Sequence, residues 1–356
     1  MGGRCRAEAA RPGCLLSSQP VPRGAGLDDP VTDLTEDPSR GVHDTELELV
    51  AAHLASLDHD GQRFADVLRA TLDQLLDGRR NGRYEYQKLH KTEKTHMGTL
   101  VEINLHREFE FDDGDVTDYR IAGVEVDCKF SQRIGGWEMG PEMVGHLCLV
   151  VTASDQNSSW RAGLVRATEM HLRSVQNRDA KRRLNEAGVA AIRWLWPEHG
   201  KLAENLLLHL DPETCKRIMN AEGRNQRHGQ ARIFQLFREV RVQGIILRRT
   251  IIETVGHGLD DPMKRARGNG GARDALRPDG ILVLGHQDND PLVARALGLP
   301  VPKKGELVAA RVTPAPAIPD ERPTAEVNGT YWVVARSEDE PIAAPVIPRK
   351  RAEGNL

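Results

Sequence analysis

The amino-acid sequence predicts an α/β protein of two domains, and three observations support this. The chain has 356 residues, which is more than one typical domain contains. Amphipathic helical patterns are followed by short strand patterns and further helix in the first half, as in α/β and α+β domains. A stretch with Pro, Gly and charge at 196–203 interrupts these patterns. We interpret it as a linker between a domain at 42–195 and a second at 204–350.

The composition excludes several classes of protein. Hydrophobic residues make up 39% of the chain, too many for a wholly disordered protein. The longest apolar runs, such as 147–153, are far shorter than the ~20 residues that a membrane helix needs, so we expect no contact with a membrane. The 5 cysteines are scattered and never spaced as C-x-x-C, which argues against a disulfide framework or a structural zinc site. No signal-peptide pattern is present, and we expect a cytoplasmic protein.

The N-terminal part of the chain contains a tail followed by helices. Residues 1–41 are rich in Gly, Pro, Ser and Arg without sustained periodicity, and we expect this extension to be disordered. A first helix is predicted after Asp44, a suitable N-cap. A second is predicted between Asp60 and Gly78, and a third over 92–108.

Strand patterns follow these helices. Residues 118–121 and 124–130 alternate between apolar and polar side chains, and the Ala122-Gly123 pair between them predicts a hairpin turn. Further elements expected in this domain are a buried central strand at 147–153, a strand beginning at 163–165, and a helix over 168–184.

The hairpin carries the most informative set of polar residues. Because side chains alternate along a strand, Asp127 and Lys129 must lie on the same face. The hairpin can bring Asp118 beside Asp127, and two neighbouring carboxylates repel unless a cation lies between them. A hard, oxygen-preferring ion such as Mg²⁺ fits, and Lys129 can stabilise charge on phosphate oxygens. This pattern predicts a phosphodiester-hydrolysing site, although D-x₈-D-x-K spacing alone also suits an ordinary surface strand pair.

Two other acidic positions are candidates for such a site. Glu102 lies between apolar neighbours in the third predicted helix, and is either a further acid of the site or a surface residue in a good helix-forming position. Pro278-Asp279 is the alternative opening of such a motif, but no acid-x-Lys pattern follows it on a strand. We therefore prefer the hairpin.

Charge is unevenly distributed along the chain. Residues 27–78 contain thirteen acidic and three basic side chains, whereas 224–277 contain twelve basic and five acidic ones, a net charge of +7. Short helices predicted at 231–240 and 244–255, followed by a strand at 281–284 and a Pro-rich β-like tail, suit a winged-helix module. A basic region of this kind indicates either a DNA-binding surface or a solvated face.

Long runs of the sequence resemble a known family. The segment 89–109, the segment 117–130 and the run at 286–291 are similar to type IIE restriction endonucleases of the NaeI-like family, and the likeness extends from about 58 to about 349. The resemblance implies a Mg²⁺-dependent nuclease domain with the restriction-endonuclease fold, followed by a catabolite-activator-like winged-helix domain. It places the catalytic set on Glu102, Asp118, Asp127 and Lys129, with Glu102, Asp118 and Asp127 as metal ligands.

The same resemblance implies partners and activity. The enzyme would be a homodimer that cuts both strands of duplex DNA at a short palindrome, expected to be GCCGGC, and leaves 5′-phosphates without a nucleotide cofactor. A second copy of the site, bound by the C-terminal domain, would stimulate cleavage. The DNA-binding residues expected in that domain are Arg224, Arg227, Arg232, Lys264, Arg265, Arg267 and Arg273.

Two other functions stay open at this point. The chain could be a winged-helix DNA-binding regulator whose nuclease-like half is inert, although the intact set on the hairpin argues against this. It could also be a repair nuclease that nicks one strand. Incubation of a plasmid with the protein and Mg²⁺ separates these alternatives.

Overall fold

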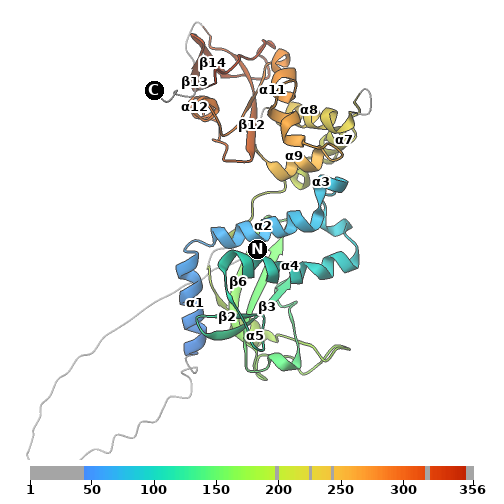
Figure 1. Cartoon of the computed structure of the whole chain (residues 1–356), viewed down its shortest axis with the longest axis vertical. Coiled ribbons are helices and arrows are strands. Elements are labelled where there is room, and N and C mark those ends of the chain that lie inside the picture. Colours follow the sequence, from blue (N-terminus) through green and yellow to red (C-terminus); the bar gives the residue numbers. More distant parts are fainter. Residues whose placement is uncertain (1–43, 197–199, 224–226, 242–243, 317–320, 350–356) are drawn as a thin grey trace, which may run out of the picture. The chain divides into compact units, whose positions relative to one another are not determined.

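The computed structural model describes residues 44–196, 200–223, 227–241, 244–316 and 321–349, and the predicted disordered extension lies outside them. The described residues from Asp44 onward cluster as one unit. Its first helices, shown in Figure 1, are α1 (Thr45–Leu57), α2 (Gln62–Leu76), α3 (Gly78–Asn81) and α4 (Lys91–Phe109). The three long helices confirm the predicted ones.

Local interactions explain where these helices begin and end. The Asp44 side chain accepts a hydrogen bond from the Leu47 backbone N–H at 3.1 Å, as expected for an N-cap. Helix α2 ends at Leu76, and its C-cap residue, Asp77, adopts the left-handed conformation with φ 47°. Gly78, predicted to end this helix, instead begins the short α3. A Cβ atom added at this position would overlap the Thr254 Oγ1 atom. A larger residue at Gly78 would therefore clash.

A mixed sheet forms the centre of the N-terminal region. Its strands follow the order β1-β2-β3-β5-β6-β8, and β9 also pairs with β6. Strands β3 and β5 are parallel, and the other neighbours in this sheet are antiparallel. The bounds are β1 (Asp112–Asp113), β2 (Tyr119–Ile121), β3 (Val124–Ser131), β5 (Leu147–Ser154), β6 (Ser159–Arg166), β8 (Arg193–Trp194) and β9 (Gly200–Lys201). The predicted hairpin and buried central strand are confirmed.

Helix α4 packs against both α2 and β3, so it covers this strand of the predicted hairpin directly (Figure 1). The buried side chains between these elements include Leu68, Leu72, Val101, Leu105 and Val126. They recur every three or four residues along the helices, which explains why the periodicity predicted these elements correctly. The core thus fixes Glu102, on α4, relative to the hairpin.

The helix predicted over 168–184 is wrong. This segment is irregular, with an isolated bridge between Leu172 and Leu184, and it ends in β7 (Arg182–Arg183), which pairs with β4 (Glu138–Met139). Asn185 then caps the short helix α5 (Glu186–Ala190) through a hydrogen bond from the Gly188 N–H. The Asn177 side chain accepts hydrogen bonds from the backbone N–H groups of Asp179 and Lys181, which competes with a helix. The apolar residues Leu172 and Leu184 are spaced as they are because they pack in a cluster with residues of the sheet.

The predicted linker is partly integrated into the N-terminal core. Trp196 packs beside this core, and its indole donates a hydrogen bond to the Asp58 carbonyl at 3.1 Å. Strand β9 pairs with β6, and Leu202 is buried in the same core. The chain therefore leaves this core later than the Pro and Gly pattern indicated.

The C-terminal region consists of short helices followed by a curled antiparallel sheet. Its helices are α6 (Leu206–His209), α7 (Pro212–Met219), α8 (His228–Val240), α9 (Arg249–Val255), α10 (Pro262–Arg267), α11 (Ala272–Ala275) and α12 (Asp290–Ala296). Its strands are β10 (Ile246–Arg248), β11 (Ile281–Leu284), β12 (Glu306–Pro314), β13 (Thr324–Val327) and β14 (Thr330–Val334). The sheet order is β10-β12-β14-β13, with β11 also paired to β12.

One expectation for this region is refined and another is confirmed. The helix predicted over 244–255 divides into β10 and the shorter α9, because Leu247 pairs with Leu307 on β12. The strand predicted at 281–284 is confirmed as β11, with all four residues buried. None of the described helices has the length and apolar character that crossing a membrane requires.

Candidate active site

The β2–β3 hairpin brings the predicted acidic residues together. Tyr119 pairs with Val126 across the two strands, so Asp118 lies next to Asp127. Ala122 and Gly123 form the connecting turn, with φ values of 51° and 82°. Positive φ at both central positions is the geometry of the type I′ turn, which matches the twist of the strands.

Each charged side chain on this hairpin has a defined contact. The Cys128 backbone N–H donates a hydrogen bond to Asp118 Oδ2 at 2.7 Å, which fixes that carboxylate. Asp127 is buried, with 4% of its surface exposed, and its Oδ2 forms an ion pair with Lys129 Nζ. This contact confirms that Asp127 and Lys129 lie on one face of β3.

Glu102 reaches the same site from α4. The Tyr119 hydroxyl, on the fully buried first residue of β2, donates a hydrogen bond to the Glu102 carbonyl at 2.8 Å. Burial raises the pKa of the Glu102 carboxyl, and the nearby Asp118 charge raises it further, while Lys129 opposes this. Glu102 is therefore in electrostatic contact with the hairpin charges, which favours the site interpretation over a surface residue.

The electrostatics of the pair on β3 are unusual for strand residues. Burial raises the pKa of Asp127 to about 6, and Asp118 adds to this rise against the opposing effect of Lys129. Burial alone would lower the pKa of Lys129, but the charges of Asp127 and Asp118 outweigh it and raise the pKa. Lys129 is therefore held as an ammonium ion. Its single positive charge does not fully compensate the two neighbouring carboxylates, Asp118 and Asp127.

The oxygen atoms of this site fit a divalent cation of the Mg²⁺ type. Asp127 Oδ2 is buried and has no hydrogen-bond donor among the described residues apart from its ion pair with Lys129. Carboxylate oxygens are the protein ligands that Mg²⁺ prefers, commonly one or two of them with water and phosphate oxygens completing the shell. In the part of the chain that the structure describes, no three acidic, histidine or cysteine side chains lie close enough to hold a metal ion. The Asp118 charge nevertheless raises the pKa of both Asp127 and Glu102, so these three carboxyl groups lie within electrostatic range of one another.

Glu125 is a site-supporting residue that the sequence analysis missed. Its carboxylate accepts hydrogen bonds from the backbone N–H groups of Asp115, Val116 and Thr117, at 3.0, 3.1 and 3.1 Å, and pairs with Arg120. The hydrogen bond from the Asp115 N–H is the largest of several that hold the pKa of Glu125 well below its usual range. These contacts fix the loop that leads into Asp118. The sequence signal was available, since Glu125, Asp127 and Lys129 follow the strand period of two.

Comparison with known proteins covers both the hairpin and the basic C-terminal region. A family model described as Restriction endonuclease NaeI matches residues 48–344. The chain belongs to the NaeI restriction endonuclease family. A curated relative, the type II restriction enzyme NaeI of Lentzea aerocolonigenes, is 58% identical over 311 residues, which cover 87% of this chain and 96% of the relative. The family resemblance of the sequence is thus confirmed.

In this NaeI-family chain, the predicted DNA-binding cations fall into different environments. Lys264, Arg265 and Arg267 are exposed on α10, and Arg227 is exposed before α8. Arg273 is half-buried and paired with Asp290 at 2.5 Å. Arg224 lies outside the described residues.

The prediction for Arg232 is corrected by its burial. This side chain is 8% exposed, and its guanidinium donates hydrogen bonds to the carbonyls of Val255 and His257 at 2.7 and 2.6 Å. It therefore satisfies carbonyl groups at the C-terminal end of α9 and stabilises the packing of α8 on α9. A phosphate group cannot reach it without unfolding these contacts.

A large basic cleft occupies the surface around α10. The cleft has a volume of about 770 Å³, and its lining includes the cations Arg248, Arg249, Lys264, Arg267 and Lys304. Arg248 and Arg249 are already ion-paired, with Asp73 and Glu253. Lys264 and Lys304 have no acidic partner among the described residues, so their charges are available to an anion. Lys304 was missed because it lies outside the basic segment defined by the sequence.

Proposed function

We propose that this chain is a type II restriction endonuclease that hydrolyses both strands of duplex DNA at a short palindrome and leaves 5′-phosphates. The observation that carries the proposal is the coupled set of Asp118, Asp127 and Lys129 on one hairpin, with Glu102 beside it. The family relationship supports the same activity. Because its substrate is DNA, the enzyme would work in the cytoplasm.

Each residue of the hairpin would have a separate role in hydrolysis. Lys129, held as an ammonium ion by Asp127, places a positive charge where negative charge grows on the phosphate oxygens. Asp118, fixed by the Cys128 N–H, and Asp127, with Glu102 next to them, would hold Mg²⁺. When bound, the ion supplies Lewis-acid polarisation of the phosphate and activation of water. Glu125 anchors the loop that leads into Asp118, and the Tyr119 hydroxyl anchors the backbone of α4 at Glu102.

We further propose that the C-terminal region is a winged-helix module that binds a second copy of the recognition site. Short helices followed by antiparallel strands support this fold, and the basic cleft around α10 supports a DNA ligand. Exposed Lys and Arg neutralise phosphates without reading sequence, so this surface would supply salt-dependent affinity. The division into a nuclease domain, which includes β9 and Leu202, and an effector domain from about residue 204 belongs to this proposal, as does the homodimer.

Plasmid cleavage tests the activity. The protein is incubated with Mg²⁺ and supercoiled plasmids that contain none, one or two copies of the expected site GCCGGC, and the cut ends are sequenced. Discrete linear products with 5′-phosphate ends at one palindrome are expected. Binding without cleavage would support the inert regulator, and open circles without linear product would support a nicking nuclease.

A one-site plasmid tests the second DNA site. Effector DNA must bind the cleavage-competent conformation more tightly than the resting one. A typical coupling free energy of ~1–3 kcal/mol corresponds to a ~5- to 150-fold change in affinity. A short duplex carrying the site should therefore accelerate cleavage of the one-site plasmid. If added duplex merely competes, and one-site and two-site plasmids are cut equally fast, the two-site proposal is wrong.

A further inference from the structure

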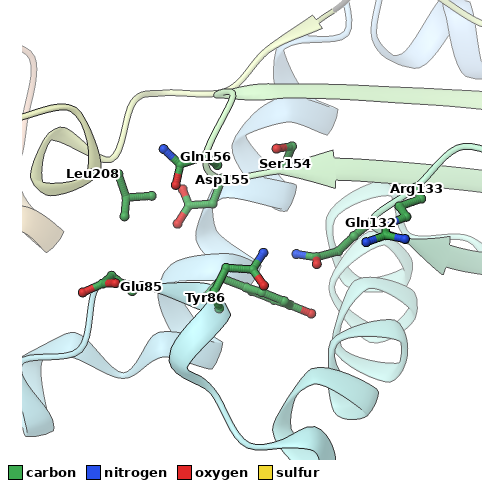
Figure 2. Close-up of a pocket in the computed structure, with 9 residues that line it drawn as sticks. Glu85, Tyr86, Gln132, Arg133, Ser154, Asp155, Gln156 and Leu208 are labelled. Carbon is green, nitrogen blue, oxygen red and sulfur yellow. The ribbon is translucent and has the colours of Figure 1, made fainter.

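A polar cleft lies at the carboxyl ends of the two parallel strands β3 and β5. It has a volume of about 210 Å³, and Figure 2 shows Gln132 and Arg133, which follow β3, together with Ser154, Asp155 and Gln156, at the end of β5. The loops that follow these two strands leave the sheet at this edge, and their polar side chains line the cleft. The position of this cleft therefore suits a ligand.

The loop that carries Arg133 is held rigidly. The Arg133 N–H donates to Ser131 Oγ at 3.1 Å, and the Ser131 hydroxyl donates to the Arg133 carbonyl at 2.9 Å. The Gly136 N–H donates to that same carbonyl at 3.0 Å, and the indole of buried Trp137 donates to the Val151 carbonyl of β5 at 2.9 Å. The backbone that presents Arg133 is thus pinned at both ends, which lowers the entropy that binding must remove.

The side chains facing the cleft have unused hydrogen-bonding capacity. Asp155, buried within it, is satisfied by Arg69 and by Asn205, whose amide donates at 3.0 Å. In contrast, the side chains of Gln132, Arg133 and Gln156 make no hydrogen bond or ion pair within the described ranges. Long amide and guanidinium groups on a fixed loop, next to a satisfied carboxylate, are available to a polar ligand.

The cleft lies close to the proposed catalytic residues, because Gln132 and Arg133 follow the strand that carries Lys129. Ser131, the last residue of β3, follows Lys129 by two residues, and Arg133 follows two residues later in the loop, so the Cα atoms of Lys129 and Arg133 are at most about 14 Å apart. Base pairs of B-DNA are ~3.4 Å apart along the axis, so a duplex whose scissile phosphate lies at Lys129 has base edges within a few steps of this cleft. Arginine binds guanine O6 and N7 through two parallel hydrogen bonds, and glutamine amides suit other base edges.

We infer that this cleft reads base edges of the DNA being cut, with Arg133 as the guanine-reading residue and Gln132 beside it. This inference rests on the proposed nuclease function and assigns part of its sequence specificity. The Arg133 guanidinium would act by a bidentate contact, which a lysine cannot reproduce.

The test compares Arg133→Ala and Arg133→Lys with the unmodified protein. The ratio kcat/KM is measured on a duplex with the cleaved site and on duplexes in which each G·C pair is replaced in turn. The matched control is Arg107→Ala, because Arg107 is exposed and lies five residues after Glu102, about 140° around α4. Circular dichroism verifies that each variant is folded.

For both Arg133 variants, kcat/KM on the recognition duplex should fall by about 5- to 150-fold. The ratio of kcat/KM between the recognition duplex and the substituted duplexes should fall by a matching factor at one or two G·C positions. Arg107→Ala should resemble the unmodified protein on every duplex. Retention of activity by Arg133→Lys together with an equal loss by Arg133→Ala on all duplexes would identify a phosphate contact and overturn the inference, as would no change in either variant. Failure of the proposed function looks different, because the unmodified protein would then cut no duplex.

Discussion

The β2–β3 hairpin and the basic cleft around α10 both concentrate charge, but in opposite ways. The hairpin uses a few charges that are buried or half-buried and fixed by hydrogen bonds, such as Asp118 on the Cys128 N–H. The cleft presents many cations that are exposed to solvent, and Lys264 and Lys304 have no acidic partner among the described residues. Buried charges interact strongly at short range, whereas exposed charges are screened within about 8 Å at physiological salt.

Buried and exposed charges should respond differently to substitution. A buried, coupled set fails as a unit, because each member sets the protonation and position of the others. An exposed set of cations contributes separately, so substitutions there produce small and nearly additive effects.

The largest effect is expected from Asp127→Ala and Lys129→Ala. Each should lower the cleavage rate by at least about 10³-fold, because these groups stabilise the transition state, while contacts elsewhere preserve DNA binding. Plasmid cleavage and a gel-shift measurement of DNA affinity provide the two readouts. Asp112→Ala, at an exposed aspartate of β1, is the control and should cut normally. Substantial cutting by either hairpin variant would mean that the catalytic set lies elsewhere.

A smaller effect is expected from Glu125→Gln, which weakens the anchor of the loop before Asp118. Displacement of a catalytic group by about 1 Å costs ~10²-fold, so we expect kcat to fall by about 10- to 100-fold with little change in DNA affinity. Single-turnover cleavage at saturating protein measures this. Glu142→Gln, at an exposed glutamate, serves as the comparison. If Glu125→Gln instead lowered affinity and left the cleavage rate intact, Glu125 would belong to a binding surface.

Exposed cations of the cleft should each have modest effects. For Lys264→Ala and Lys304→Ala, we expect weaker DNA binding and a slope of log affinity against log salt that is smaller by about 0.9 for each phosphate that the variant no longer neutralises. The neighbouring Lys303→Ala is a close control, since Lys303 is exposed but does not line the cleft. Binding isotherms at several salt concentrations provide the slopes. Equal slopes for all three variants and the unmodified protein would place the DNA on another surface.

The smallest effect on activity is expected from Asp44→Ala. The Asp44 carboxylate stabilises the fold and lies outside the proposed catalytic set. Asp44 caps α1 and pairs with Arg166 at 2.7 Å, and the hydrogen bond with Arg166 lowers the pKa of Asp44. The substitution should cost about 1–2 kcal/mol of unfolding free energy at pH 7 with normal cleavage. Because the folded-state pKa is lowered, this stabilisation is present above the ordinary pKa of 3.8 and is lost as pH falls through the folded value. Urea unfolding at pH 7 and pH 3 measures it, and an equal loss at both pH values would argue against an ionic contribution.

Much of the N-terminal region could be predicted from local pattern. The helices at 45–57, 62–76 and 91–109 follow from apolar residues every three or four positions, and the hairpin follows from alternation around Ala122-Gly123. The strand period alone placed Asp127 and Lys129 on one face. The irregular segment at 168–184 could not be predicted, because its apolar residues contact a sheet whose position is set by distant parts of the chain.

Side chains alternate along any strand, so the sequence pattern was enough to specify that Asp127 and Lys129 share a face of β3. Which cations stay exposed depends instead on how distant segments of the chain pack together. Arg232 and Arg267 are equally basic in sequence, yet Arg232 is buried against the α9 carbonyls, whereas Arg267 lines the cleft together with Lys304 from a distant loop. The physical reason is that the exposure of a charge depends on which groups pack around it, and those groups come from segments far away in the sequence.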